Sequence, residues 1–260
     1  MGKIEMKKEF NIWEGIYNSF EDAAPISVGN GFASDIWIER TLSVANECLA
    51  ALNTGKAIPF EHKQRSTILP AIVAMLLSKN DKVNILDFGG GLGIGYMTLA
   101  ESIPGYSTRV KYNIVELSEV CEQGKKIDEN INYLTALPLV GEFNLIHSAS
   151  AFQYIDDWRE FLSNLCSYNA PYILLSDVFA GSIPTFVTLQ NYYENKIKFR
   201  FFNLDELVAH FSSLGYVLEM KTHVNSKRLD SLNVIPMDNF PESHRIDLTL
   251  HLLFCKSKED

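Results

Sequence analysis

The sequence predicts a doubly wound α/β fold, with a seven-stranded sheet, helices on both of its faces and an N-terminal helical cap. Three observations support this prediction. Residues 83–93 form a short apolar run that ends in an acid and glycines, and a helical pattern follows. From residue 84 onward, strand-like and helix-like patterns alternate, which is typical of parallel sheets. Helical patterns with apolar stripes precede the first strand, so we divide the chain into a cap, residues 1–80, and a domain, residues 81–260.

The cap contains two predicted helices. Ser34 or Asp35 can cap the first, which runs to about Asn53 and ends before Gly55. The second covers residues 65–78, where apolar side chains recur at helical spacing. Because apolar stripes of this kind can pair two copies of a chain, we expect a homodimer through these helices.

Residues 1–31 have the least regular pattern of the chain. Trp13, Gly15 and Tyr17 lie close together among polar residues. Two interpretations remain open: the aromatic side chains hold this segment against the core, or the segment is a flap over a functional site.

The remaining elements follow the alternation of the two patterns. The predicted strands cover residues 83–88, 110–115, 131–134, 143–147, 172–176, 216–223 and 246–255. The predicted helices between them cover residues 96–103, 119–130, 158–166 and 205–214. Residues 178–203 fit neither pattern, so we expect an irregular insertion there.

Composition excludes several classes of function. A net charge of −9 argues against a nucleic-acid partner, because phosphate binding requires clustered Lys and Arg. No apolar run is long enough for a membrane span, and the charged first ten residues do not resemble a signal peptide, so we expect a cytoplasmic protein. The cysteines lack metal-ligand spacing, and the pair Asp156-Asp157 is typical of a helix start, so we predict no metal.

The glycine turn after the first strand carries the main functional signal. Its residues form the pattern D-x-G-x-G-x-G with a further glycine inside it: Asp87, Gly89, Gly90, Gly91 and Gly93. A dinucleotide fingerprint would need G-x-G-x-x-G, and the positions that should hold its third glycine are Ile94 or Tyr96. The spacing therefore disfavours a nicotinamide dehydrogenase.

This pattern resembles motif I of the class I S-adenosylmethionine (SAM) methyltransferases, which have a Rossmann-like fold. The resemblance implies that the acid and the glycine turn hold the methionyl end of SAM, and that the last strand runs antiparallel. Glu116 ends the second strand, where an acid in doubly wound folds accepts hydrogen bonds from ribose hydroxyls. Many of these enzymes have a further acid after strand three that meets the adenine, but this chain has Thr135 there. A backbone group, Thr135 or an apolar contact such as Leu117 must then hold the adenine.

The segment after the fourth strand is the predicted methyl-transfer region. Ser148 is small and leaves room for a ligand, while Gln153 and Tyr154 can orient the cofactor or the acceptor. Alternatively, Phe152 and Tyr154 only pack against the following helix. A base that takes the acceptor's proton would assist transfer to an alcohol. His147 is one candidate, although it can equally be a core residue, and Asp177 is its rival.

Further segments resemble one family of class I methyltransferases associated with bacterial surface-polysaccharide loci. These segments, in chain order, are Trp13-x-Gly15-x-Tyr17, L-D-F-G-G-G-L-G, F-Q-Y-I-D-D-W, Thr188-x-Gln190, F-N-L-D-E-L and Gly215-Tyr216. That family has a basic residue and a proline after strand five, where this chain has Asp177-Val178-Phe179-Ala180. Its acceptor can therefore differ from those of its relatives.

The resemblance implies a SAM-dependent O-methyltransferase of capsule or other polysaccharide biosynthesis. Its product would be S-adenosylhomocysteine (SAH), and its acceptor a hydroxyl of a sugar, a sugar nucleotide or a surface-glycan substituent. Two alternatives remain: a small-metabolite O- or N-methyltransferase outside glycan assembly, or a catalytically idle binding subunit with the SAM fold.

Overall fold

The computed structural model describes residues 10–27, 31–228, 231–232 and 234–257. Its main sheet has seven strands in the order β10-β13-β6-β5-β2-β3-β4. Their bounds are β2 Val83–Phe88, β3 Val110–Val115, β4 Ile131–Leu134, β5 Leu145–Ala149, β6 Tyr172–Val178, β10 Tyr216–His223 and β13 Leu250–Lys256. Strands β2 to β6 pair in parallel, and β13 runs antiparallel between β6 and β10. The predicted fold class is therefore confirmed.

Helices cover both faces of this sheet because its side chains alternate between two apolar cores. Strand residues such as Ile85 and Leu174 pack on one face against helices of the first half of the chain, and Leu86 and Leu175 pack on the other face against later helices. On the first face lie α4 (Leu69–Leu77), α5 (Ile94–Ser102) and α7 (Ser118–Ile127). On the second face lie α8 (Trp158–Ser167) and α9 (Leu204–Ser213).

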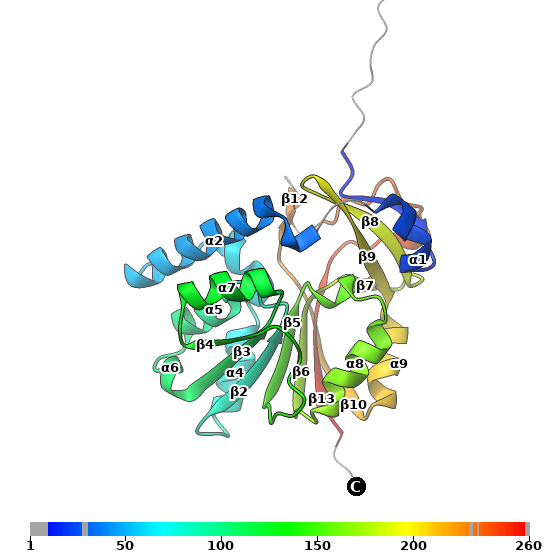
Figure 1. The fold of residues 1–260 in the computed structure, drawn as a ribbon. Helices are drawn as coiled ribbons and strands as arrows, with labels where there is room; N and C mark the ends of the chain where they lie inside the picture. Colours follow the sequence, from blue (N-terminus) through cyan, green and yellow to red (C-terminus); the bar gives the residue numbers. More distant parts are fainter. Residues whose placement is uncertain (1–9, 28–30, 229–230, 233, 258–260) are drawn as a thin grey trace, which may run out of the picture.

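The cap helices lie close to their predicted positions. Helix α2 spans Asp35–Asn53 and contacts α5 and α7, across which it extends in Figure 1. Helix α4 begins at Leu69, four residues later than predicted, because the preceding residues form a 3-10 turn over Gln64–Ser66. Strand β13 likewise begins at Leu250 where the sequence predicted residue 246.

The prediction of an irregular insertion at 178–203 is wrong, because these residues build most of a second sheet. Its four strands have the order β1-β8-β9-β7, with bounds β1 Trp13–Tyr17, β7 Ala180–Gly181, β8 Phe186–Tyr192 and β9 Asn195–Asn203. The turn between β8 and β9 lacks the usual glycine: Tyr193 itself adopts a φ of +52°. A hairpin with that turn leaves no signal in the sequence.

The N-terminal segment is also more regular than predicted, since β1 pairs antiparallel with β8. Trp13 is buried among Phe179, Phe199 and Phe201, with ring centroids 5.4–5.7 Å away. The aromatic contacts that one interpretation assigned to this segment are present, and they are made mainly with the second sheet. In Figure 1 this sheet lies beyond the upper ends of β5 and β6.

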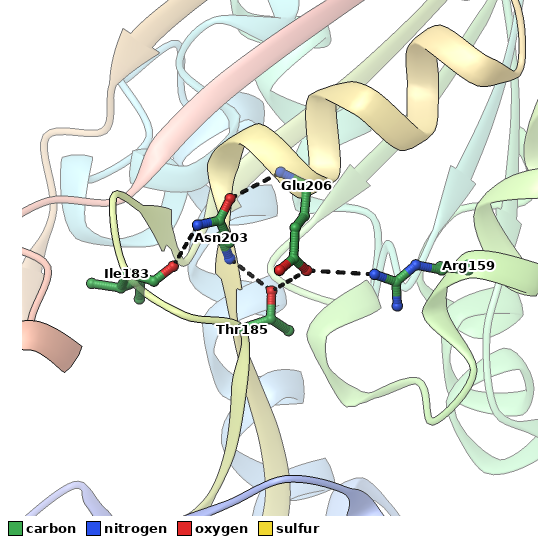
Figure 2. A network of polar contacts seen from close by, with 5 residues as sticks. All are labelled: Arg159, Ile183, Thr185, Asn203 and Glu206. Carbon is green, nitrogen blue, oxygen red and sulfur yellow. Dashed lines mark hydrogen bonds and ion pairs between the residues drawn. The ribbon is translucent and has the colours of Figure 1, made fainter.

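A polar network fastens the second sheet to the main domain (Figure 2). Asn203, at the end of β9, caps α9 by accepting the backbone N–H of Glu206 at 2.9 Å and donates to the carbonyl of Ile183 at 2.8 Å. The Glu206 carboxylate accepts the Thr185 hydroxyl at 2.9 Å and lies 3.4 Å from Arg159 on α8. The second sheet is thus held to both helices of one face. No helix within the described ranges is long and apolar enough to cross a membrane.

Candidate functional site

The glycine turn between β2 and α5 can form only because its glycines adopt left-handed backbone conformations. Gly89, Gly91 and Gly93 have φ values of +70°, +55° and +85°. A Cβ on Gly89 would lie 2.3 Å from the Cβ of Ala151, so the turn packs directly against the segment after β5. A Cβ on Gly91 would meet no atom within 4 Å, so this part of the turn faces open space at the start of α5.

Glu116 lies beside this turn, at the end of β3. Its two carboxylate oxygens accept the backbone N–H groups of Gly91 at 3.1 Å and Leu117 at 2.9 Å. Burial raises the pKa of Glu116, although these two hydrogen bonds oppose the shift. A partly buried carboxylate that meets two donors keeps further acceptor capacity for hydroxyl or ammonium groups. Leu117 and Thr135, both exposed, flank it at the ends of neighbouring strands.

Asp87 contacts protein groups beneath the glycine turn. Its carboxylate accepts the Tyr112 hydroxyl at 2.6 Å and lies 2.9 Å from Nδ1 of His147. A Cβ on Gly90 would lie 2.6 Å from the Asp87 Oδ2 atom, so a residue larger than glycine would clash with the carboxylate here. The other ring nitrogen of His147 lies 3.2 Å from the Ser176 hydroxyl. Asp87 and His147 are each 1% exposed, so both belong to a buried network under the turn.

Two polar side chains, one near the end of β5 and one in the turn after it, are buried with unused hydrogen-bonding atoms. Ser148 and Gln153 are fully buried, and within the described part of the chain neither Ser148 Oγ nor Gln153 Oε1 has a hydrogen-bond partner. The Gln153 amide donates to the Ser150 hydroxyl at 3.1 Å. Since an unsatisfied buried polar atom costs free energy, such atoms indicate a ligand that completes their bonding.

The end of β6 has a distorted backbone that redirects Asp177. The pairing of β6 with β13 shifts register here, so that His251 faces both Ser176 and Asp177, and Asp177 adopts a φ of +54°. The Asp177 carboxylate, fully buried, accepts the Thr249 hydroxyl at 2.6 Å and lies 3.0 Å from Nε of Arg65. Bulges and left-handed non-glycine residues concentrate near functional sites, where they reorient side chains.

Tyr154 lies in the 3-10 turn Phe152–Tyr154 and connects the main domain to the second sheet. Its hydroxyl donates to Oε1 of Gln190 on β8 at 2.8 Å, and its ring packs edge-on against Phe199. Phe152 is buried and stacks on Phe202 with centroids 4.7 Å apart. In these contacts both rings pack against β9 and not against the following helix, and Tyr154 also makes a polar contact.

The structure divides the predicted residues into groups at neighbouring strand ends. One group lies at the ends of β2, β3 and β4 and contains Asp87, the glycines, Glu116, Leu117 and Thr135. The other lies at the ends of β5 and β6 and contains Ser148, Gln153, Tyr154 and Asp177. His147 belongs to the network beneath both groups. Sequence reasoning missed Arg65, Tyr112, Thr249 and His251. Tyr112 and His251 lie within apolar strands, and Arg65 lies at a predicted helix start, so none carries a local signal of its own.

Comparison with known proteins gives a family and a fold. Residues 60–235 match the model of a family described as a methyltransferase domain. No curated protein matches the sequence. A similar solved structure is that of the Burkholderia thailandensis 1,6-didemethyltoxoflavin-N1-methyltransferase with bound 1,6-didemethyltoxoflavin and S-adenosylhomocysteine; it has 14% identity and a TM-score of 0.53, covering 89% of this chain and 94% of that one. Another is an S-adenosylmethionine-dependent methyltransferase of Clostridium acetobutylicum, with 10% identity, a TM-score of 0.52 and coverages of 85% and 99%.

Proposed function

The chain belongs to the methyltransferase-domain family, and we propose that it transfers a methyl group from SAM to a hydroxyl of a small polar acceptor. The acceptor that we propose is a sugar, a sugar nucleotide or a surface-glycan substituent. The acceptor class is supported by the resemblance of the ordered segments from Trp13 to Gly215-Tyr216 and by the net charge of −9, which disfavours nucleic acid.

The observation that carries the SAM assignment is the pairing of the glycine turn with Glu116. A left-handed glycine turn lets the backbone approach a ligand closely, and the Glu116 carboxylate is fixed against that turn by the Gly91 N–H. The site fits SAM, because ribose hydroxyls and an ammonium group are hydrogen-bond donors, and the unpartnered buried atoms Gln153 Oε1 and Ser148 Oγ and the Glu116 carboxylate can accept. We assign the ribose to Glu116 and the methionyl end to the glycine turn.

When bound, SAM supplies an electrophilic methyl group on a sulfonium. The contribution of the protein is alignment and exclusion of water, which account for most of the rate of a direct displacement. Gln153 and Ser148 are buried at the end of β5, next to the glycine turn, and can orient the reacting groups without side-chain rearrangement. Tyr112 and His147 hold the Asp87 carboxylate in place, and Asp87 in turn supports the glycine turn.

Three side chains can handle the acceptor's proton, and we assign them different roles. We propose Asp177 as the base, because the bulge in β6 turns its carboxylate toward Arg65, whose side chain is half exposed, whereas the ring of His147 contacts only buried groups. We propose that Tyr154 orients the acceptor through its hydroxyl, which is already fixed by Gln190. His147 is 1% exposed and engaged at both ring nitrogens, so we propose that it positions Asp87 and Ser176.

The organisation of the chain completes the proposal. We propose a division near residue 80, homodimerisation through α2 and α4, and a cytoplasmic location. Analytical ultracentrifugation of the purified chain tests the dimer.

Calorimetric titration of SAM and SAH tests the proposed cofactor role. We expect both to bind the wild type, binding to fall at least about tenfold in Glu116→Ala, and no change in the exposed control Glu122→Ala. An absence of binding to the wild type, or equal binding to both variants, would contradict the proposed cofactor site. Methylation of sugar nucleotides, neutral glycosides and amines, measured with labelled SAM, then tests the acceptor class.

A further inference from the structure

Arg65 presents hydrogen-bond donors on the side of the site where we place the acceptor. It lies in the 3-10 turn Gln64–Ser66, and its Nε is 3.0 Å from Oδ2 of the fully buried Asp177. Half of the Arg65 side-chain surface is exposed. A guanidinium carries five N–H donors in a planar fork, so donors remain beyond the one that contacts Asp177. Asp177 therefore orients a cation that keeps binding capacity of its own.

Two tyrosines near this cation belong to a cluster of aromatic rings. Phe32 packs edge-on against Tyr154, with centroids 4.7 Å apart, and also contacts Trp37 at 5.5 Å and Tyr192 at 5.4 Å. Arg65 lies within electrostatic range of Tyr154 and Tyr192. These rings come from the cap, the turn after β5 and the second sheet, so all three parts of the fold meet beside Arg65. Aromatic rings of this kind provide apolar faces on which a flat or ring-shaped ligand can stack.

The local charge near Tyr192 differs from that of the whole chain. Burial raises the pKa of Tyr192 to about 12, with Tyr193 adding to the shift, whereas Arg65 and Arg40 act in the opposite direction. Arg40, on α2, also lies over the Tyr193 ring at 4.8 Å. Two guanidinium groups thus approach one tyrosine in a chain whose net charge is −9. Asp177 balances the charge of Arg65 and the charge of Arg40 adds to it, so this part of the site favours an anionic ligand over a cationic one.

This cation is also next to the proposed methyl-transfer centre. Ala151 packs against Gly89 of the glycine turn, and Ser150 donates its backbone N–H to the carbonyl of Ser176 at 2.9 Å. Asp177 follows Ser176 directly. A ligand held by Arg65 would therefore lie beside the end of β6, next to the segment that packs against the glycine turn. We assign the methionyl end of SAM to that turn.

We propose that Arg65, positioned by Asp177, binds an anionic group of the acceptor and that the acceptor is a phosphorylated or carboxylated sugar. This inference rests on the proposed methyltransferase function and narrows its substrate class. Arginine suits both phosphate and carboxylate because its fork matches either group with two parallel hydrogen bonds. Tyr154 and Tyr192 would line the site of the attached ring.

The test measures binding of defined anions by calorimetry, with and without saturating SAH. The probes are inorganic pyrophosphate, a nucleoside diphosphate hexose, a free hexuronate and an uncharged methyl hexoside. We expect at least one anionic probe to bind the wild type. Its affinity should fall about tenfold or more in Arg65→Gln and less in Arg65→Lys, which keeps the charge but loses the fork. Preference for the phosphorylated probes or for the hexuronate identifies the anionic group.

Arg159→Gln is the matched control, because Arg159 is 55% exposed and also lies beside a carboxylate, that of Glu206. Its affinity for the probes should equal that of the wild type. The inference is overturned if no anionic probe binds the wild type, or if Arg65→Gln and Arg65→Lys lose thermal stability while their probe affinities stay unchanged. Failure of the proposed function is separate: SAH would then not bind, whereas the anion titrations without SAH would still depend on Arg65.

Discussion

The proposed site has a donor half and an acceptor half, and the two are built in different ways. The donor half consists of the glycine turn at 89–93 and Glu116, and it lies where two adjacent parallel strands end. The acceptor half consists of Arg65, Tyr154, Asp177 and Tyr192, which come from the cap, the main domain and the second sheet. The donor half depends on backbone conformation, so few substitutions there are tolerated. The acceptor half depends on contacts between side chains, so it can change its ligand while the fold stays the same.

The largest effect is expected for Gly91→Ala, compared with Gly55→Ala. Both glycines have positive φ values, +55° and +66°, and a Cβ on either would meet no atom within 4 Å. Each substitution should therefore cost about 1 kcal/mol of stability from the left-handed backbone alone. Only Gly91 lies in the donor half, so only Gly91→Ala should weaken SAH binding, by roughly 100-fold. Urea unfolding measures the stability of both variants, and SAH titration measures their affinity. An equal loss of SAH affinity in the two variants would contradict the assignment of Gly91 to the donor half.

His251, which faces Asp177 of the acceptor half, is expected to make the stability of the fold sensitive to acid. Burial lowers the pKa of His251 to about 4, with His147 acting in the same direction and Asp177 opposing it. The unfolded chain then takes up a proton near pH 6.5, whereas the folded chain does not. Stability should consequently rise with pH between about 4 and 6.5, and His251 should cost about 2 kcal/mol at pH 5.

The substitution His251→Phe tests this dependence. Neither ring nitrogen of His251 has a hydrogen-bond partner within the described residues, and the ring borders a cavity of about 250 Å³, so phenylalanine should fit without loss at pH 7.5. The unfolding free energy of this variant should fall less between pH 7.5 and pH 5 than that of the wild type. His223→Gln, at an exposed position, should retain the wild-type slope; a common slope in all three proteins would contradict the assignment.

Glu116→Gln should separate binding from stability in the donor half. Because burial raises the pKa of Glu116, its contribution to stability is complete below about pH 4.5 and is lost as pH rises through the folded-state pKa. The neutral amide removes the cost of burying a charge, but its NH2 group replaces one of the two oxygens that accept a backbone N–H. The two effects oppose each other, so the stability of the free protein at pH 7.5 should change by no more than about 1 kcal/mol, while SAH affinity falls about tenfold through the loss of charged hydrogen bonds. Differential scanning fluorimetry with and without SAH measures both quantities. A marked loss of stability without ligand would argue for a structural role of the carboxylate.

The smallest effect is expected for Asn203→Ala, which disturbs the attachment of the second sheet. Loss of the α9 cap should lower the unfolding free energy by about 1 kcal/mol, and loss of the bond to Ile183 should add to this. Asp157→Ala removes only the cap of α8, a bond to Glu160, and provides the matched comparison. Neither variant should change SAH affinity. A loss of SAH affinity in Asn203→Ala but not in Asp157→Ala would show that the second sheet supports the donor half as well.

The sequence by itself determined the main sheet and the donor half. Short, mainly apolar runs define β2, β3 and β4 to the residue, because the strands of a parallel sheet are buried on both faces. The glycine turn and Glu116 could be located for a related reason: parallel strands joined by a helix bring their carboxyl ends to one edge of the sheet. Both inferences use short-range patterns and one topological rule.

Only the tertiary structure decided which side chains lie together in the proposed acceptor half and what surrounds the candidate bases. The pairing of β1 with β8 joins segments at distant positions of the chain. The β8–β9 turn at Tyr193 lacks the glycine from which a hairpin is usually predicted. The bulge that turns Asp177 toward Arg65 arises from a register shift against β13. Contacts between distant segments depend on how whole elements pack, and no local pattern of residue types encodes that packing.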